Sequence, residues 1–324
     1  MTTAEALDPA TVPAMPDALD RPSQMPAVGL RMRLKTSPLL RRLLPTRVIV
    51  NRAVRQAQAS WEQSPEAREE ALATMETIIA GTPRAHELEQ LSREYLIERD
   101  AASAMFWQPW MIPDLDAQSA ARLHAVLATG RGVLFSACHI GPYAGTMSIF
   151  KPLGRLPTSV AGSWFFAKPT ADLWGRRLAR WQKGNYARLI NSKGSFPILK
   201  ELLERGELVY ICFDMPGRHE TRFLGRPATL ADGSARLAVE SDALVLPVRA
   251  RRTGHRKSVD LGAALDPRQF AGVDELHNAL AEVHERWILE RPAEIEDPRS
   301  HGWGDGATAQ AWIAPQRQSR KAES

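Results

Sequence analysis

The sequence predicts an α/β protein with a mixed, mostly parallel open sheet flanked by helices and preceded by an N-terminal helical segment. Three nearly continuous apolar runs, at residues 133–138, 207–213 and 243–249, are typical of strands buried on both faces. Segments of helical periodicity separate these runs. Because strands that alternate with helices are joined by crossover connections, most of these strands are expected to be parallel.

The 324 residues are expected to divide into four segments. Residues 1–28 are rich in proline and alanine and are predicted to be a disordered tail. Residues 29–112 form a basic helical region, residues 113–314 form the α/β domain, and residues 315–324 form a second disordered tail. Hydrophobic residues make up 44% of the chain, which is ordinary for a globular protein with a sizeable core.

Helical periodicity dominates residues 39–106. Ser64 is suited to cap a helix, Pro65 to occupy its first turn, and Glu66 to complement the helix dipole. A further helix is predicted from residue 84 to residue 104.

Helices and strands alternate in the α/β domain. Besides the three apolar runs, strands are predicted at 158–161 and 187–190. Helices are predicted at 116–128, 142–150, 169–182, 195–204, 234–241 and 273–290.

The basic N-terminal region mixes cations with apolar residues. Residues 21–60 contain no Asp or Glu, whereas arginines, one lysine, leucines and valines alternate there. This pattern favours an anionic membrane surface, although a solvated basic helix face is the competing interpretation. No apolar run of about 18 residues and no signal peptide is found. We expect a cytoplasmic protein, peripheral on the inner face of the plasma membrane, and no nucleic-acid partner.

Two cysteines, Cys138 and Cys212, lie in apolar strand-like runs and are predicted to be buried free thiols. Metal-ligand spacings such as CxxC and HExxH are absent. The sequence therefore predicts neither a bound metal nor another bound cofactor.

Two predicted strands end in titratable residues, His139 and Asp214. In open α/β sheets, active sites lie beyond the carboxyl ends of the strands, so both residues are candidate catalytic groups. A neutral imidazole at such a turn can act as a general base, and Gly141 permits close approach of a substrate. The competing interpretations are a buried structural histidine and an aspartate that caps the turn.

Several blocks, in order, resemble the lipid A lauroyl/myristoyl acyltransferase family of the lysophospholipid acyltransferase-like superfamily. The resemblance covers residues 120–297. Its main blocks are the strand running into His139 (132–141), Lys193–Pro197, Phe213–Asp214, Phe223–Ala228, Gly233–Ala238, Ala243–Val248 and His284–Glu294.

The resemblance implies transfer of a fatty acyl group from acyl carrier protein or a coenzyme A thioester to a lipid or glycolipid acceptor. That family uses a His-x4-Glu/Asp pair, but the acidic position counted from His139 is occupied by Ala144, and no Asp or Glu lies between Asp116 and Asp172. Three explanations remain open. Asp214 orients His139, the protein is a degenerate relative that binds lipid without turnover, or Cys138 acts as a nucleophile beside His139.

Further residues are predicted to contact substrate. Gly141 and Tyr143 adjoin His139. Basic residues in two regions can bind phosphate or other anionic groups. These are Arg177 and Arg180 on the 169–182 helix, and Arg218 and Arg222 in a predicted loop after Asp214. A solvated surface is the competing interpretation for each arginine.

Overall fold

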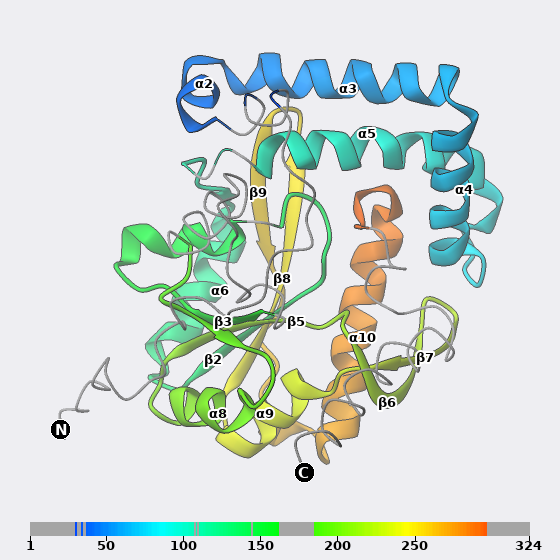
Figure 1. The fold of residues 1–324 in the computed structure, drawn as a ribbon. Helices are drawn as coiled ribbons and strands as arrows, with labels where there is room; N and C mark the ends of the chain where they lie inside the picture. The colour runs from blue at the N-terminus through cyan, green and yellow to red at the C-terminus, as the bar shows by residue number, and fades with distance from the viewer. Residues whose placement is uncertain are drawn as a thin grey trace, which may run out of the picture.

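The computed structural model describes residues 37–106, 108, 110–143, 145–161 and 185–296, together with Leu30 and Leu34. A seven-stranded sheet with the order β1-β9-β8-β2-β5-β3-β4 forms its centre (Figure 1). Neighbouring strands are parallel except for the β8–β9 pair. The prediction of a mixed, mostly parallel sheet is confirmed.

The strands are short at one edge of the sheet and long in the β8–β9 hairpin. Their bounds are β1 (Asp114–Leu115), β2 (Val133–Ala137), β3 (Thr158–Ala161), β4 (Arg188–Asn191), β5 (Leu208–Cys212), β8 (Leu244–Thr253) and β9 (Arg256–Leu261). A separate antiparallel hairpin consists of β6 (Pro216–Phe223) and β7 (Arg226–Leu230). Neither the β8–β9 hairpin nor the β6–β7 hairpin was predicted from the sequence. The outer positions of their strands are polar and interrupt the apolar runs.

Alternate residues of β2 pack into two different cores, as expected for a central strand. Val133, Phe135 and Ala137 face a core shared with α6 (Ala117–Ala128) and the 3-10 helix η2 (Thr146–Leu153). Leu134 faces the larger core. The sheet is therefore covered on both sides.

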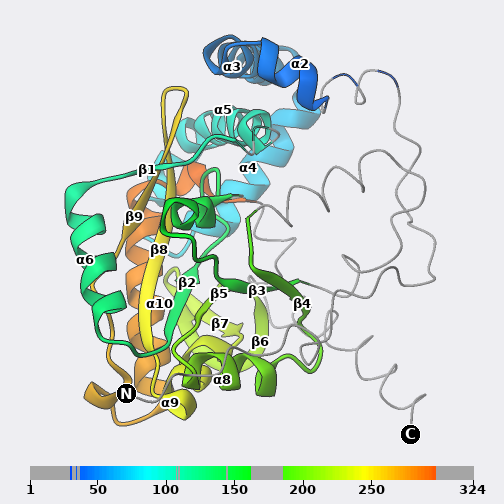
Figure 2. The same cartoon turned by 90° about the vertical axis from the view of Figure 1, so that its left-hand side faces the viewer.

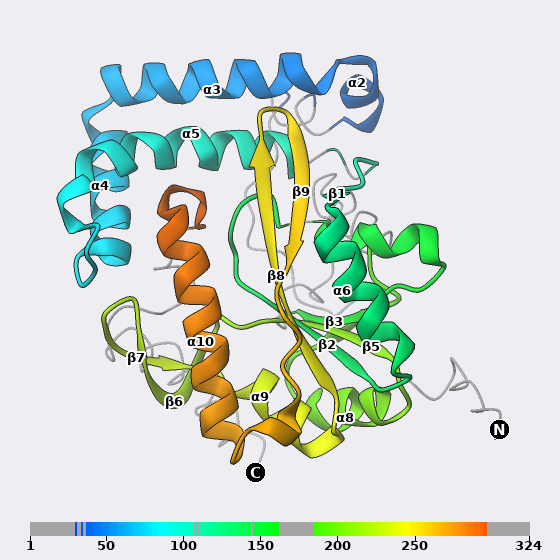
Figure 3. The ribbon, with the colours of Figure 1, turned by 180° about the vertical axis from the view of Figure 1, so that it is seen from behind.

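The helices α8 (Phe196–Glu204), α9 (Gly233–Ser241) and α10 (Val273–Glu290) contribute to the larger core, together with residues from the N-terminal helices. Figure 3 shows α10 beside α9, whereas α6 runs along β9 (Figures 2 and 3). Ser136 of β2 bonds His284 of α10 across 3.0 Å, and this contact ties α10 to the centre of the sheet.

The N-terminal helices form a layer at one end of the molecule (Figure 1). They are α2 (Pro38–Leu43), α3 (Thr46–Gln63), α4 (Pro65–Ile79) and α5 (Leu88–Phe106), with the 3-10 turn η1 (Ala85–Glu87) before α5. Ser64 accepts a hydrogen bond from the backbone N–H of Ala67, so the predicted cap of α4 is confirmed. Arg41 of α2 is buried and donates to the carbonyl of Ala104, which fixes α2 on α5.

One predicted helix is corrected by the structure. Instead of an α-helix over 142–150, the chain turns at Gly145, whose φ is +84°, and continues as the 3-10 helix η2. The left-handed backbone of Gly145 ends any helix that begins at Pro142, and Pro152 cannot donate a backbone hydrogen bond near the end of η2. Both predicted tails and the predicted 169–182 helix lie outside the described residues. Among the described residues, no helix is long and apolar enough to cross a membrane.

Gly132 marks a close approach between the start of β2 and the end of α8. A Cβ placed there would lie 2.2 Å from the backbone oxygen of Leu203. We expect Gly132→Ala to lower the free energy of unfolding by about 1–3 kcal/mol, as in other overpacked sites. Urea denaturation measures this, with Gly233→Ala as the control because a Cβ at that position meets nothing within 4 Å. Equal stability of the two variants would contradict the prediction.

Candidate active site

The register of two central strands brings His139 and Asp214 together. In the parallel β2–β5 pair, Ala137 lies opposite Cys212. The backbone N–H of Phe213 donates to the carbonyl of Ala137, which continues the pairing one step beyond the strands. His139 and Asp214 each follow this register pair by two residues, and they leave the sheet at the same edge. Neither residue needs a long loop to reach the other.

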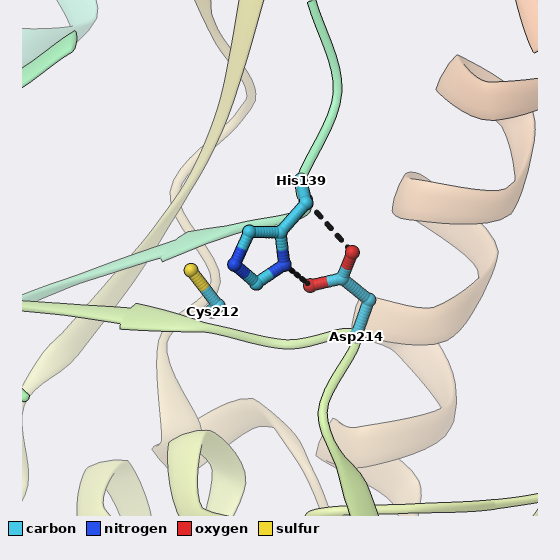
Figure 4. A group of neighbouring side chains, drawn as sticks. All are labelled: His139, Cys212 and Asp214. Atoms are coloured by element: carbon cyan, nitrogen blue, oxygen red, sulfur yellow. Dashed lines mark hydrogen bonds and ion pairs between the residues drawn. The ribbon is translucent and has the colours of Figure 1, made fainter. Parts of the chain in front are cut away.

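Asp214 holds His139 through two hydrogen bonds. Its Oδ1 lies 2.8 Å from the imidazole Nδ1, and its Oδ2 accepts the backbone N–H of His139 at 2.7 Å (Figure 4). The Asp214 side chain is 0% exposed. Because an ionised carboxylate only accepts hydrogen bonds, Nδ1 must carry a proton. This fixes the tautomer and makes Nε2 the proton acceptor of the neutral ring.

Cys212 completes a group of three side chains. Its Sγ, a ring nitrogen of His139 and a carboxylate oxygen of Asp214 lie within 4.8 Å of one another. Figure 4 shows the imidazole between the other two side chains, with Nδ1 toward Asp214 and the second nitrogen toward Cys212. We call His139, Cys212 and Asp214 the strand-end triad.

The strand-end triad also offers donor types that bind zinc. Asp214, however, already uses one oxygen on the imidazole and the other on a backbone N–H. A metal ion would have to compete with both of these hydrogen bonds. The arrangement therefore fits a nucleophile, a base and an orienting acid better than a metal centre.

Opposing effects act on the ionisation of His139. Burial is the largest single effect and lowers its pKa, but the charges of Asp214 and Cys212 and hydrogen bonds to both groups raise it. The balance raises the pKa of His139 well above its usual value of about 6.5. Asp214 and Cys212 thus stabilise the imidazolium that arises when Nε2 takes a proton.

A C-terminal segment holds the turn that follows His139. The backbone N–H of Gly141 donates to the carbonyl of Glu294 at 2.7 Å, and the N–H of Glu296 donates to the carbonyl of His139 at 2.8 Å. Gly141 has a φ of +63°, and a Cβ there would lie 2.6 Å from the Ala250 oxygen. The glycine is therefore required by backbone packing.

Tyr143 packs edge-on against the imidazole, with ring centroids 4.8 Å apart. Burial and then the charge of Glu296 and a hydrogen bond to it raise the pKa of Tyr143 well above its usual value. Tyr143 thus stays neutral and braces the ring of His139. Its predicted contact with substrate is untested and remains a proposal, as is that of Gly141.

Cys138 is not placed to act as a nucleophile. Its side chain is 1% exposed and packs in the larger core. Burial, as the largest effect, raises the pKa of the Cys138 thiol well above its usual value. The hypothesis of a Cys138 nucleophile is therefore wrong, and the half-buried Cys212 occupies the position beside His139 instead.

The structure describes only two of the four arginines that were predicted to contact substrate. Arg177 and Arg180 lie outside the described residues. Arg218 and Arg222 belong to β6 rather than to a loop, on the exposed face of that strand. Arg222 donates to the Gly225 carbonyl and lines a surface hollow of about 910 Å³. None of the described residues lining this hollow belongs to the strand-end triad, so a shared substrate site is not supported for Arg222.

The place of Cys212 beside His139 was not predicted from the sequence. The spacing of Cys212 and Asp214 could have indicated it, because residues two apart at the end of one strand lie on the same side of the sheet. Because Cys212 was predicted to be a buried thiol of the core, its position on the same side as Asp214 was not considered.

Part of the chain is similar to a known protein family. Residues 171–295 match the family model of the bacterial lipid A biosynthesis acyltransferases. This match supports the resemblance inferred from the sequence over residues 171–295. It includes Cys212 and Asp214 and begins after His139, so the first block of the resemblance stays a prediction.

The chain also matches solved structures. One of them is the crystal structure of the 1-acyl-sn-glycerophosphate (LPA) acyltransferase from Thermotoga maritima, with 13% sequence identity, a TM-score of 0.40, and coverage of 79% of this chain and 99% of that one. A search of curated proteins finds no match.

Removing the charge of Asp214 should lower the pKa of His139. In Asp214→Asn, burial still opposes the imidazolium, while the largest effect that raises the pKa is gone. The ring should then lose its proton at a lower pH than in the wild type. Histidine ring signals followed by NMR across a pH titration measure this. Asp274→Asn is the control, since that side chain is 87% exposed, and an unchanged His139 titration in Asp214→Asn would contradict the prediction.

Proposed function

We propose that this chain, which is related to the bacterial lipid A biosynthesis acyltransferases through residues 171–295, transfers a fatty acyl group from an acyl-thioester to a lipid or glycolipid acceptor at a membrane surface. The observation that carries this proposal is the hydrogen bond from His139 Nδ1 to Asp214. It orients Nε2 to take a proton from an attacking group, as in hydrolase triads.

Asp214 supplies from a neighbouring strand what the family motif would supply from position 144. In both arrangements a carboxylate fixes the tautomer of the imidazole and stabilises its cation. Ala144 itself lies outside the described residues. The geometry of Asp214 supports the first of the three explanations drawn from the sequence, in which an acid elsewhere in the chain orients His139.

The proposed donor is a fatty acyl thioester of acyl carrier protein or coenzyme A, and no bound cofactor is required. Thioesters are activated toward attack, so a positioned base and a bound acceptor suffice for the reaction. Arg177 and Arg180 remain proposed contacts for anionic groups of the substrates.

An exposed apolar surface on the N-terminal helices supports membrane binding. The side chains of Leu39 and Leu43 in α2 are 68% and 70% exposed. Leu40, Leu44 and Val48 are exposed beside them, and so are Arg42, Arg47, Arg52 and Arg55. Apolar side chains next to cations suit the headgroup layer of an anionic membrane. We propose peripheral binding to the inner face of the plasma membrane through α2 and the start of α3.

Loss of His139 should remove transfer activity. We expect His139→Ala to lower acceptor-dependent thiol release from an acyl-thioester by about 100-fold or more, which is the usual contribution of a general base. A free-thiol reagent measures release with purified protein. His255→Ala is a matched control because His255 is exposed at the tip of the β8–β9 hairpin. Undiminished release by His139→Ala would contradict the assignment.

The same assay separates an active enzyme from a degenerate relative that binds lipid, which is the alternative suggested by the missing motif acid. A degenerate relative would bind liposomes and release no thiol with any donor and acceptor, and Ala144→Glu would raise its activity. If Asp214 already orients His139, Ala144→Glu leaves the rate unchanged or lowers it.

Acidic substitutions on α2 should weaken membrane binding. Leu39→Asp/Leu43→Asp places two charges where apolar side chains are proposed to enter the lipid, and we expect the bound fraction to fall roughly tenfold or more. Flotation with vesicles containing anionic phospholipid measures binding. The control is Val239→Asp, an exposed apolar position on α9 at the opposite end of the molecule from α2 (Figure 1). Equal flotation of both variants would rule out this surface.

A further inference from the structure

Cys212 lies where a nucleophile would lie relative to the other two members of the strand-end triad. It is the last residue of β5, Asp214 follows two residues later, and His139 projects from the end of the adjacent strand β2. The reactive atoms of the three side chains lie within 4.8 Å of one another, with the imidazole in the middle (Figure 4). This order of thiol, imidazole and carboxylate defines a cysteine nucleophile with its base and orienting acid.

The direction of the imidazole supports this order. Nδ1 is committed to Asp214 at 2.8 Å, so the ring nitrogen that faces the thiol is Nε2. A hydrogen bond between Cys212 and the imidazole is among the effects that raise the pKa of His139. The imidazole can therefore take the thiol proton and stabilise the resulting thiolate as an ion pair.

The surroundings of Cys212 differ from those of Cys138. Cys212 is half-buried, whereas Cys138 is buried in the larger core. Tyr210 lies on the same side of β5 as Cys212. Its hydroxyl is buried and has no hydrogen-bond partner among the described residues. A buried phenol in this position is a donor available for an oxyanion that forms near the sulfur.

We propose that Cys212 carries the acyl group as a covalent thioester, so that transfer runs through an acyl-enzyme. The inference rests on the proposed function, since it uses the same acyl-thioester donor and the same base. Cys212 Sγ attacks the donor carbonyl, the bond from that carbonyl to the carrier sulfur breaks, and the carrier leaves as a thiol with the proton from His139 Nε2. The acceptor hydroxyl then attacks the acyl-Cys212 carbonyl and gives its proton to His139. The bond from that carbonyl to Cys212 Sγ breaks, and the proton passes from His139 to the released sulfur.

Both steps balance without an oxidant, a reductant or a metal. The first exchanges one thioester for another and is close to thermoneutral, and the second forms the acyl ester of the acceptor. The free carrier thiol and the acylated acceptor are the only products.

The acyl-enzyme can be tested on the full-length protein by intact-protein mass spectrometry after acid quenching. Two donors are used without acceptor: decanoyl-coenzyme A, and p-nitrophenyl decanoate, which needs no carrier recognition. We expect a mass increase of one decanoyl group that neutral hydroxylamine removes and that maps to the peptide containing Cys212. Cys212→Ala should lack the adduct and lose transfer activity by about 10³-fold or more. Cys212→Ser should form an oxyester that resists neutral hydroxylamine.

Cys138→Ala is the matched control and should retain the adduct. Absence of an adduct on Cys212 with both donors, or full transfer activity in Cys212→Ala, overturns the inference. If Cys212→Ala transfers normally while His139→Ala does not, the proposed function stands and only the covalent route fails. An adduct from the p-nitrophenyl ester that depends on His139, without any thioester turnover, supports the nucleophile and counts against the proposed donor.

Discussion

The buried carboxylate of Asp214 is the constraint on which the site depends. A carboxylate removed from water loses several kcal/mol of solvation unless charge-assisted hydrogen bonds replace it. Here both oxygens are occupied by donors from one residue, the backbone N–H and the imidazole Nδ1 of His139. The pairing of β2 with β5 and the orientation of the imidazole are thus one event, because the strands cannot close around Asp214 unless His139 is in place.

The same pair is braced from outside the sheet. The segment that follows α10 bonds the backbone of His139 and Gly141 through Glu296 and Glu294. Ile140 forms an isolated bridge with Ile295 in the same place. The turn after β2 is therefore fixed between the end of β5 on one side and the C-terminal segment on the other. A histidine held this rigidly is suited to a proton-transfer role that requires one fixed direction.

The sequence predicted the features that depend on local pattern. Apolar runs identified the central strands, and strand ends identified His139 and Asp214, because parallel strands share one carboxyl edge. Features that depend on pairing were missed. The polar outer positions of β6, including Arg218 and Arg222, resemble a loop until β7 is known to pair with that strand. To decide which cysteine, Cys138 or Cys212, lies beside His139, the register between β2 and β5 is needed. This register is a property of the strand pair and cannot be predicted from either strand alone.

Because Asp214 orients His139 from a neighbouring strand, it influences both steps of the proposed transfer through Cys212. Asp214 and Cys212 both favour the imidazolium form of His139 because they raise its pKa, whereas burial opposes that form. This form is a poor base for an acceptor hydroxyl and a good partner for a thiolate. In the proposed acyl-enzyme Cys212 has no ionisable thiol, so one of the effects that raise the pKa of His139 is absent while burial still lowers that pKa. The imidazole then loses its proton more readily and becomes the base that the acceptor needs, which links the formation of the acyl-enzyme to the activation of the next step.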